Sequence, residues 1–193
     1  MITSEQARIL AMASDVSYDT NPSLTGYTVV NFDSPLTDPD TGFNAVIFQK
    51  TGTHEYIVAF TGTQPKTIQD PLADLTLGTK QWNDNKNKVL AALRHLEDLG
   101  ATNISFTGHS LGGGLAQYAT YDYLKDASDN NRTPAQVFLA TYNAFGGTFG
   151  LQQMYETTFN PALAAQVDAA HFFASSSGRP DLVSRLEFWG QYM

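Results

Sequence analysis

The sequence has no cysteine among its 193 residues. Disulfides and thiolate-bound metals are therefore excluded as sources of stability. Basic residues are also scarce, because 11 Lys and Arg stand against 19 Asp and Glu and give a net charge of −8. The basic residues form no cluster, and the net negative charge repels phosphate backbones and anionic lipid headgroups. We therefore expect no nucleic-acid partner.

Long apolar runs are absent as well. No apolar stretch approaches the roughly 20 residues of a membrane-spanning helix. Residues 1–19 lack the basic region followed by an apolar region that marks a secretory signal, and they read instead as an amphipathic helix. The sequence does not determine the cellular compartment, and export by a leaderless route or after removal of a signal remains an alternative. A chain of this length fits one domain with one core.

Three short segments in the first half are rich in β-branched and aromatic residues and predict strands, at residues 26–32, 43–49 and 55–60. Pro, Asp and Gly between them are typical of turns, so we expect an antiparallel meander. From Trp82 onward the spacing of apolar residues becomes helical and ends at Gly100. The residues that carry this helical spacing are Val89, Leu90, Leu93, Leu96 and Leu99.

The second half of the chain alternates between predicted strands and helices. Residues 103–108 predict a strand, 111–127 a helix and 135–146 a further strand, which implies a right-handed parallel crossover. Residues 169–175 predict a last parallel strand. The expected fold class is therefore α/β, a mixed sheet with antiparallel strands first and parallel strands after them, flanked by helices. Sites in such sheets lie at the carboxyl ends of the strands.

One short stretch, TGHSLGGGLAQYAT at residues 107–120, contains a candidate catalytic serine. Gly108, Ser110 and Gly112 fit the pattern G-x-S-x-G, in which a sharp turn from strand to helix exposes the serine hydroxyl. Glycines flank the serine because side chains there collide with the neighbouring strand and helix. The turn also puts Ser110 at a helix N-terminus, which favours negative charge. The alternative is that Ser110 simply caps the helix.

These residues resemble a known family. The stretch GHSLGGGLA is similar to the nucleophile elbow of the class 3 lipases within the α/β-hydrolases, and IVAFTGTQPKTIQDPLADLTLG resembles the family's upstream strand and lid. The resemblance implies an α/β-hydrolase fold with Ser110 as nucleophile. It assigns Thr63 to the oxyanion hole, together with the backbone N–H of Leu111. The alternative for Thr63 is a turn residue at the end of a strand. Loss of one such donor typically costs about 10²- to 10³-fold in rate.

A third match, RPDLVSRL, resembles the family segment that carries the acidic residue of the triad and assigns it to Asp181. The sequence departs from the family in having Ser184 where proline is usual. An aspartate after a strand is also a common turn former, and Pro180 fits that alternative. The order of Ser110 before Asp181 is the order that α/β-hydrolases use. The resemblance spans residues 55–186.

The base of the triad is missing from its usual place, because no histidine follows Asp181. A serine hydroxyl needs a neighbouring base, and in this fold a histidine after the aspartate supplies it. His54 falls in a predicted hairpin turn, His95 on the helix face away from the leucines, and His109 within the elbow with its side chain directed away from the serine. Each reads as structural or solvated.

His171 is the remaining internal candidate for the base. It begins the strand predicted at 169–175, so we expect it toward the wrong end of that strand. The last residues are apolar and carry no helix stop. The leading hypothesis is therefore a single hydrolase domain over residues 1–193 that is incomplete at its C-terminus, with the histidine on a downstream segment or a partner chain. The isolated chain is then a poor catalyst.

A lid is predicted between Thr63 and Trp82. Its apolar residues are spaced to form one face of a short helix beside the oxyanion residue, a feature suited to closing over an acyl-chain groove. The alternative is a surface helix that packs its leucines on the core. The residues in question are Ile68, Leu72, Leu75 and Leu77.

The expected substrate is a lipid or small ester, and triacylglycerol lipase, phospholipase and short-chain esterase remain open. The alternative from another class is an inactive hydrolase-like module that binds lipid or a protein partner. Peptidase activity is a third alternative, because the same triad cleaves amides. We expect no cofactor and no metal, since Asp33, Asp38 and Asp40 have no calcium-loop spacing and read as turn residues.

Overall fold

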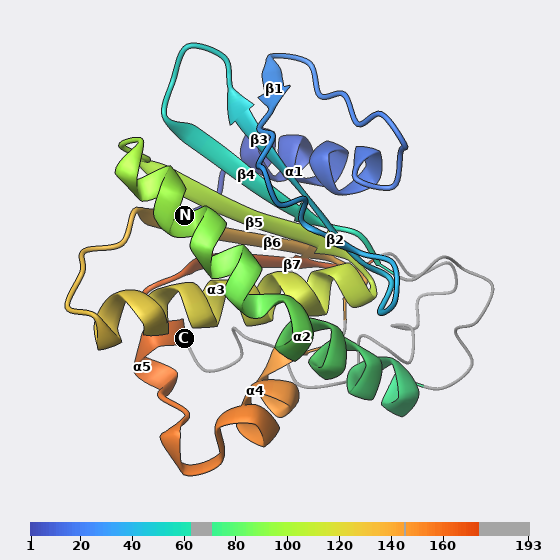
Figure 1. The fold of residues 1–193 in the computed structure, drawn as a ribbon, viewed down its shortest axis with the longest axis vertical. Helices are drawn as coiled ribbons and strands as arrows, with labels where there is room; N and C mark the ends of the chain where they lie inside the picture. The colour runs from blue at the N-terminus through green and yellow to red at the C-terminus, as the bar shows by residue number, and fades with distance from the viewer. Residues whose placement is uncertain (63–70, 145, 174–193) are drawn as a thin grey trace.

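The computed structural model describes residues 1–62, 71–144 and 146–173, and these form one mixed sheet with helices on both faces (Figure 1). The strands follow the order β1-β3-β4-β5-β6-β7 across the sheet, with β2 attached to β3. Their bounds are β1 Tyr27–Val29, β2 Thr37–Asp38, β3 Phe43–Lys50, β4 Glu55–Phe60, β5 Asn103–His109, β6 Gln136–Tyr142 and β7 Asp168–Phe172.

The direction of the strands changes halfway across the sheet. β3 pairs antiparallel with both β1 and β4, whereas β4, β5, β6 and β7 run parallel to one another. This is the mixed α/β sheet that the sequence predicted. The short strand β2 was not expected, because its residues lie in a stretch rich in turn formers. The carboxyl ends of the parallel strands share one edge of the sheet, which is where β5 reaches Ser110.

The helices cover the sheet from two sides. α1 (Ser4–Val16) packs on one face, and α2 (Pro71–Asp98) and α3 (Leu111–Asp129) pack on the other (Figure 1). α4 (Gly147–Tyr155), a short 3₁₀ turn and α5 (Pro161–Ala164) follow β6 on the side of α3. In the described part of the chain, none of these helices has the length and apolarity to cross a membrane.

The long helix α2 differs from the prediction. The sequence predicted a short lid helix and a separate helix from Trp82, but α2 is continuous over 28 residues. Leu72, Leu75 and Leu77 lie in its first turns, while Ile68 lies outside the described residues. The two predicted helices therefore form one element, and the expected short helix is its N-terminal part.

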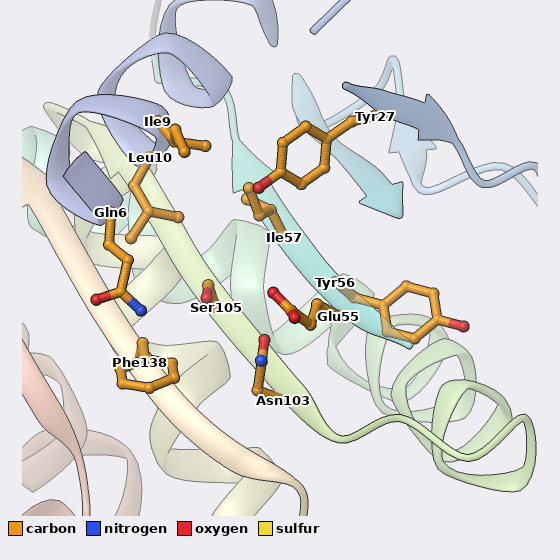
Figure 2. A pocket seen from close by; sticks show the side chains of 10 residues that line it. All are labelled: Gln6, Ile9, Leu10, Tyr27, Glu55, Tyr56, Ile57, Asn103, Ser105 and Phe138. Atoms are coloured by element: carbon orange, nitrogen blue, oxygen red, sulfur yellow. The ribbon is translucent and has the colours of Figure 1, made fainter. Parts of the chain in front are cut away.

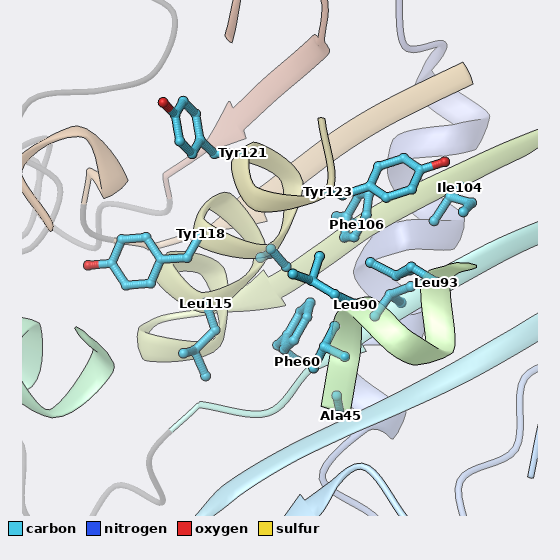
Figure 3. Close-up of a cluster of buried hydrophobic side chains, with 14 of the residues drawn as sticks. Ala45, Phe60, Leu90, Leu93, Ile104, Phe106, Leu115, Tyr118, Tyr121 and Tyr123 are labelled. Atoms are coloured by element: carbon cyan, nitrogen blue, oxygen red, sulfur yellow. The ribbon is translucent and has the colours of Figure 1, made fainter. Parts of the chain in front are cut away.

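Two apolar clusters hold the layers together. The larger lies between the sheet and the pair α2 and α3 (Figure 3) and includes Phe60, Leu93 and Phe106, all fully buried. The smaller lies under α1 and includes Leu10, Phe48 and Ile57. Burying one such side chain contributes about 1.5–3 kcal/mol. Both faces of the central strands are thus covered, which explains the nearly continuous apolar runs of β4 and β6.

A buried carboxylate ties three helices to one another. Asp122 on α3 is 3% exposed and accepts a hydrogen bond from the Trp82 indole on α2 at 2.7 Å and another from the Tyr155 hydroxyl at the end of α4. Burial raises the pKa of Asp122, and the hydrogen bonds from Tyr155 and Trp82 oppose that rise. The network fixes α4 against α2 and α3.

A second carboxylate, Asp38, anchors the turn after β2 to α2 and carries a pH-dependent prediction. Hydrogen bonds from the Thr41 hydroxyl at 2.7 Å and the Asn85 amide at 3.0 Å hold the pKa of Asp38 at about 2. Because this value is depressed, the stabilisation is present above the unfolded pKa of about 3.9 and is lost as pH falls toward 2. We expect Asp38→Asn to remove this part of the acid dependence of the unfolding free energy.

Urea denaturation of both proteins between pH 5 and pH 2 measures this difference. Asp40→Asn is the matched control, because it removes the same charge two residues away. The Asp40 carboxylate makes no hydrogen bond within the described residues, and only its backbone N–H bonds to Asp38. If the unfolding free energies of Asp38→Asn and wild type change with pH in parallel across this range, ionised Asp38 does not stabilise the turn.

Candidate active site

The turn between β5 and α3 holds Ser110 in an unusual backbone conformation. Its φ of 55° and ψ of −125° lie where non-glycine residues are rarely found. The Ser110 N–H donates to the carbonyl oxygen of Tyr142 at 2.9 Å, and the Ser110 carbonyl accepts from Gly113 at 3.0 Å. The structure around the turn therefore imposes a conformation that costs of order 1–3 kcal/mol, a pattern concentrated at functional sites.

Close backbone approach explains the glycines on either side of Ser110. A side-chain carbon added at Gly108 would lie 2.3 Å from the backbone of Gly112. One added at Gly112 would lie 2.2 Å from the carbonyl oxygen of Phe60, at the end of β4. Both contacts are with backbone atoms that cannot rotate away, so the strand, the turn and the helix come this close only with glycine.

The Ser110 side chain does not cap α3. It occupies the N-cap position, but its hydroxyl accepts no hydrogen bond from the first turn of the helix, and no described residue bonds to that hydroxyl. Within the same described set, the backbone N–H groups of Leu111 and Gly112 have no acceptor. Ser110 is 8% exposed. The alternative that Ser110 is a simple cap is therefore wrong, and the hydroxyl lies beside two N–H groups at a helix N-terminus.

The end of β4 packs directly on this turn. A carbon added at Gly62 would lie 2.6 Å from the His109 carbonyl oxygen and 3.3 Å from the Gly112 nitrogen. Thr63, assigned to the oxyanion hole by the resemblance, lies outside the described residues.

The end of α1 supports this loop, a contribution that sequence reasoning missed. The hydroxyl of Tyr18 accepts the Gly62 N–H at 2.9 Å, and the Thr61 hydroxyl donates to the Ser17 carbonyl at 2.9 Å. The Asn44 side chain donates to the Thr61 hydroxyl at 2.7 Å. These residues lie far apart in the sequence, and no local pattern signals their contact.

The position of His171 corrects the sequence prediction. The last strand begins at Asp168 and ends at Phe172, so His171 is its fourth residue and not an early one. It pairs in register with Thr141, which pairs with Gly108. His171 is therefore near the carboxyl edge, not at the wrong end. Its Nδ1 lies 2.7 Å from the Thr141 hydroxyl, and two strand spacings of about 4.8 Å separate its backbone from β5.

The other three histidines lie in different surroundings. His54 is in the hairpin between β3 and β4, at the end of the sheet away from Ser110. His95, near the end of α2, packs edge-on against Phe32 at 6.1 Å between ring centroids. His109 precedes Ser110 and is exposed. By alternation along β5 its side chain faces the side of Thr107, whose hydroxyl bonds to α1.

A small hollow between α1 and the sheet lies away from this site (Figure 2). Glu55 and Asn103, which line it, are the first residues of β4 and β5, whereas Ser110 follows the carboxyl end of β5. Its volume of about 50 Å³ is well below the roughly 300 Å³ at which small-molecule pockets begin. It is therefore too small and too remote to take an acyl chain.

Two further predicted features cannot be located. Asp181 lies outside the described residues, as does Ile68. In the part of the chain that the structure describes, no three His, Asp or Glu side chains are grouped to hold a metal ion. The described site thus consists of Ser110, the N-terminus of α3 and the end of β4.

A comparison with family models gives one match over most of these elements. The model described as phospholipase-like, a Tle-like phospholipase domain, matches residues 9–133. That range is more than half of the chain and contains most of α1, the end of β4, the elbow and all of α3. The comparison with curated proteins gives no match.

Solved structures with the same fold include fungal lipases. A triacylglycerol lipase from Penicillium expansum matches with a TM-score of 0.55 and 17% identity over 76% of this chain and 63% of its own. The Rhizomucor miehei lipase propeptide complex matches with a TM-score of 0.56 and 16% identity over 75% of this chain and 55% of its own. The chain thus spans less than two thirds of either lipase. At such identities the matches show a shared fold.

Proposed function

Because the chain belongs to the family of Tle-like phospholipase domains, we propose that it cleaves carboxylic esters of lipids through an acyl-enzyme on Ser110. The observation that carries this proposal is the strained backbone of Ser110 at the N-terminus of α3. A serine held this way without capping the helix is typical of a nucleophile. The lipase-like fold of the solved neighbours supports the same class of reaction.

In the proposed reaction the Ser110 oxygen attacks the ester carbonyl carbon while a base takes its proton. Negative charge then develops on the carbonyl oxygen, and the N–H groups of Leu111 and Thr63 are proposed to bind it. The bond to the alcohol breaks, and the alcohol leaves with the proton. Water then attacks the acyl-enzyme in the same way and releases the fatty acid.

For the base, we propose a histidine outside these 193 residues, on a further segment or on a partner chain, oriented by Asp181. The reason is geometric. Three of the four histidines lie on other faces or at the other end of the sheet, and the ring of His171 is hydrogen-bonded to Thr141 on the neighbouring strand. The base must reach hydrogen-bond distance of the Ser110 hydroxyl, about 2.6–3.2 Å.

For the substrate, the family description favours a phospholipid. The N-terminal part of α2 follows Thr63 closely in the sequence, so we propose that Leu72, Leu75 and Leu77 belong to a lid over the acyl chain. Triacylglycerol and short-chain esters are the competing substrates. Release of fatty acid from phosphatidylcholine vesicles, compared with tributyrin and p-nitrophenyl acetate, ranks these classes.

The direct test is labelling with a fluorophosphonate probe, applied both to these 193 residues and to a form that also supplies the histidine, followed by peptide mass spectrometry. In the form that supplies the histidine we expect one adduct, on Ser110, because the strained turn presents that hydroxyl at the helix N-terminus and the base activates it. Ser105→Ala is the matched control, since Ser105 lies on the same strand β5 but lines the remote hollow. That variant should label at the wild-type rate.

Two results would contradict the proposal. An adduct on another serine would move the nucleophile elsewhere. A complete lack of labelling in both forms, with phosphatidylcholine vesicles still bound in a flotation assay, would favour the inactive module that binds lipid.

A further inference from the structure

The side chain of Gln117 joins two helices beside the elbow. Gln117 lies on α3 and is 1% exposed. Its Oε1 accepts the N–H of Gly147, the first residue of α4, at 2.7 Å, and its Nε2 donates to the Gly113 carbonyl oxygen at 3.2 Å. A donor on one side and an acceptor on the other fix which end of the side-chain amide is the oxygen. The Gln117 amide therefore connects the start of α4 to the first turn of α3.

α4 is a firm support for this connection. A carbon added at Gly147 would lie 2.7 Å from the β-carbon of Gln117, so glycine lets α4 approach α3 this closely. The N-cap residue of α4, Gly146, has no side chain to cap the helix, and Gln117 supplies an acceptor in its place. At the other end of α4, the Tyr155 hydroxyl donates to the buried carboxylate of Asp122 on α3. Both ends of α4 are thus attached to α3.

From Gly113 the hydrogen bonds continue to the Ser110 turn. The peptide unit whose oxygen belongs to Gly113 carries the N–H of Gly114, and this N–H donates to the Ser110 carbonyl oxygen at 3.3 Å. The Ser110 carbonyl belongs in turn to the peptide unit that carries the N–H of Leu111. Each of these amides accepts a hydrogen bond at its oxygen and carries an N–H at its nitrogen. The side-chain amide of Gln117 and the two peptide units therefore form an unbroken amide series that ends at the Leu111 N–H.

We propose that Gln117 is a positioning residue for the Leu111 N–H, which it holds and polarises for the developing oxyanion. This inference rests on the proposed function, because the role of the Leu111 N–H does. The bond to Gly113 restrains the peptide unit that holds the Ser110 carbonyl, and so limits rotation of the unit that carries the Leu111 N–H. A donor that is already aimed at the oxyanion costs no reorganisation when charge develops.

The same bonds strengthen the last donor of the series. Hydrogen-bonded amides polarise one another, by roughly 10–30% per bond. The four residues of the series that follow the Ser110 turn or close it are all buried, so water does not compete for these bonds: Leu111, Gly113, Gly114 and Gln117. Because the Gln117 side chain is neutral, it polarises the series without placing a negative charge near the oxyanion.

The test compares Gln117→Met with wild type in the form that supplies the triad histidine. Methionine has nearly the same shape, but it can neither accept from Gly147 nor donate to Gly113. In fluorophosphonate labelling of Ser110, we expect the maximal rate constant to fall about tenfold with the half-saturating probe concentration unchanged. This loss is smaller than the roughly 10²- to 10³-fold that removal of a whole donor costs. In amide hydrogen exchange, we expect the Gly147 N–H to exchange about tenfold faster, because it loses its acceptor.

A second probe separates an effect on the donor from a general disturbance of the turn. The matching fluorophosphonothioate carries sulfur in place of the phosphoryl oxygen, and sulfur is the weaker hydrogen-bond acceptor. The ratio of the oxygen rate to the sulfur rate therefore reports how strongly the donor binds the oxygen. We expect this ratio to fall about threefold in Gln117→Met, a part of one neutral hydrogen bond. A lower maximal rate with an unchanged ratio would overturn the proposal, because Gln117 would then only support the turn.

Thr120→Val is the matched control. Thr120 is also fully buried on α3, and its hydroxyl donates to the Ala116 carbonyl oxygen at 2.7 Å, so the variant loses a buried hydrogen bond outside the amide series. It should leave the labelling rate, the ratio and the Gly147 exchange at their wild-type values. Equal losses in Thr120→Val would overturn the proposal.

Gln117→Asn is a second variant, for use if exchange of the β5 amides shows that Gln117→Met is unfolded. Its side-chain amide is one methylene group shorter and cannot bridge Gly147 and Gly113, so we expect the same losses. A folded Gln117→Asn variant with the wild-type labelling rate and ratio would overturn the proposal.

Failure of the proposed function gives a different result. In that case Ser110 does not label in wild type even when the histidine is supplied, and the inference about Gln117 falls with it. Labelling of wild type combined with a wild-type maximal rate in folded Gln117→Met rejects only the role of Gln117.

Discussion

Replacing Ser110 by glycine, in the form that supplies the triad histidine, is expected to abolish fluorophosphonate labelling and ester turnover while making the fold more stable. Loss of the nucleophile removes on the order of 10⁶ in kcat from a serine hydrolase with its full triad. Glycine, however, adopts the φ of 55° at this position without the strain that serine carries. We expect the unfolding free energy to rise by about 1 kcal/mol, measured by urea denaturation.

Ser110→Ala separates the two effects. Alanine also lacks the hydroxyl, so labelling should be lost equally, but its β-carbon keeps the backbone strain. Its unfolding free energy should therefore stay within about 0.5 kcal/mol of wild type. A glycine variant no more stable than the alanine variant would show that the turn stores no strain. Full labelling in either variant would show that another residue is the nucleophile.

The site's central turn could be predicted because its information is local. Strand residues, a serine between glycines and a helical segment follow one another within a dozen positions, and the physical reason for each glycine is a contact inside this unit or with the next strand. The α/β sheet was predicted for a similar reason. Its strands are short β-branched and aromatic runs, and their order along the chain restricts how they can pair.

The extent of α2 could not be predicted from local preference. The helical spacing of apolar residues became regular only from Trp82 onward, so the sequence predicted two separate helices. In the structure, Gln81 and Asn85 instead turn toward the β2–β3 turn and bond to Thr41 and Asp38. These tertiary contacts outweigh propensity, so the helix continues through the expected gap.

The support from α1 was out of reach for another reason. Tyr18 and Gly62 are 44 residues apart, and one hydrogen bond between them leaves no periodic or compositional trace. The location of His171 could not be predicted either, because it depends on where β7 begins and ends. An error of a few residues in the bounds of β7 moved this side chain from one end of the strand to the other.

The second large effect is expected from Gly112→Ala. The added methyl carbon would lie 2.2 Å from the Phe60 carbonyl oxygen and 2.8 Å from the Gly62 nitrogen. Both are backbone atoms in or next to β4, so relief requires α3 to move away from the sheet. We expect the unfolding free energy to fall by at least about 3 kcal/mol. Thermal and urea denaturation measure this loss.

The same displacement should also slow the reaction at Ser110. Moving the first turn of α3 shifts the Leu111 N–H relative to Ser110, and a shift of about 1 Å costs on the order of 10² in rate. Labelling of the folded fraction of Gly112→Ala should therefore fall by about this factor, even under conditions where the variant remains folded. A variant that is destabilised but labels normally would show that the close approach serves only packing.

Gly113→Ala provides the contrast, because its clash is with a side chain. A carbon added there would lie 2.4 Å from the Ala144 methyl carbon. The double variant Gly113→Ala with Ala144→Gly should regain part of the lost stability, since one methyl group replaces another. No side-chain truncation can relieve Gly112→Ala in the same way, because its clash is with the backbone of β4. Equal rescue of both variants by Ala144→Gly would contradict this account of why the elbow requires glycine at position 112.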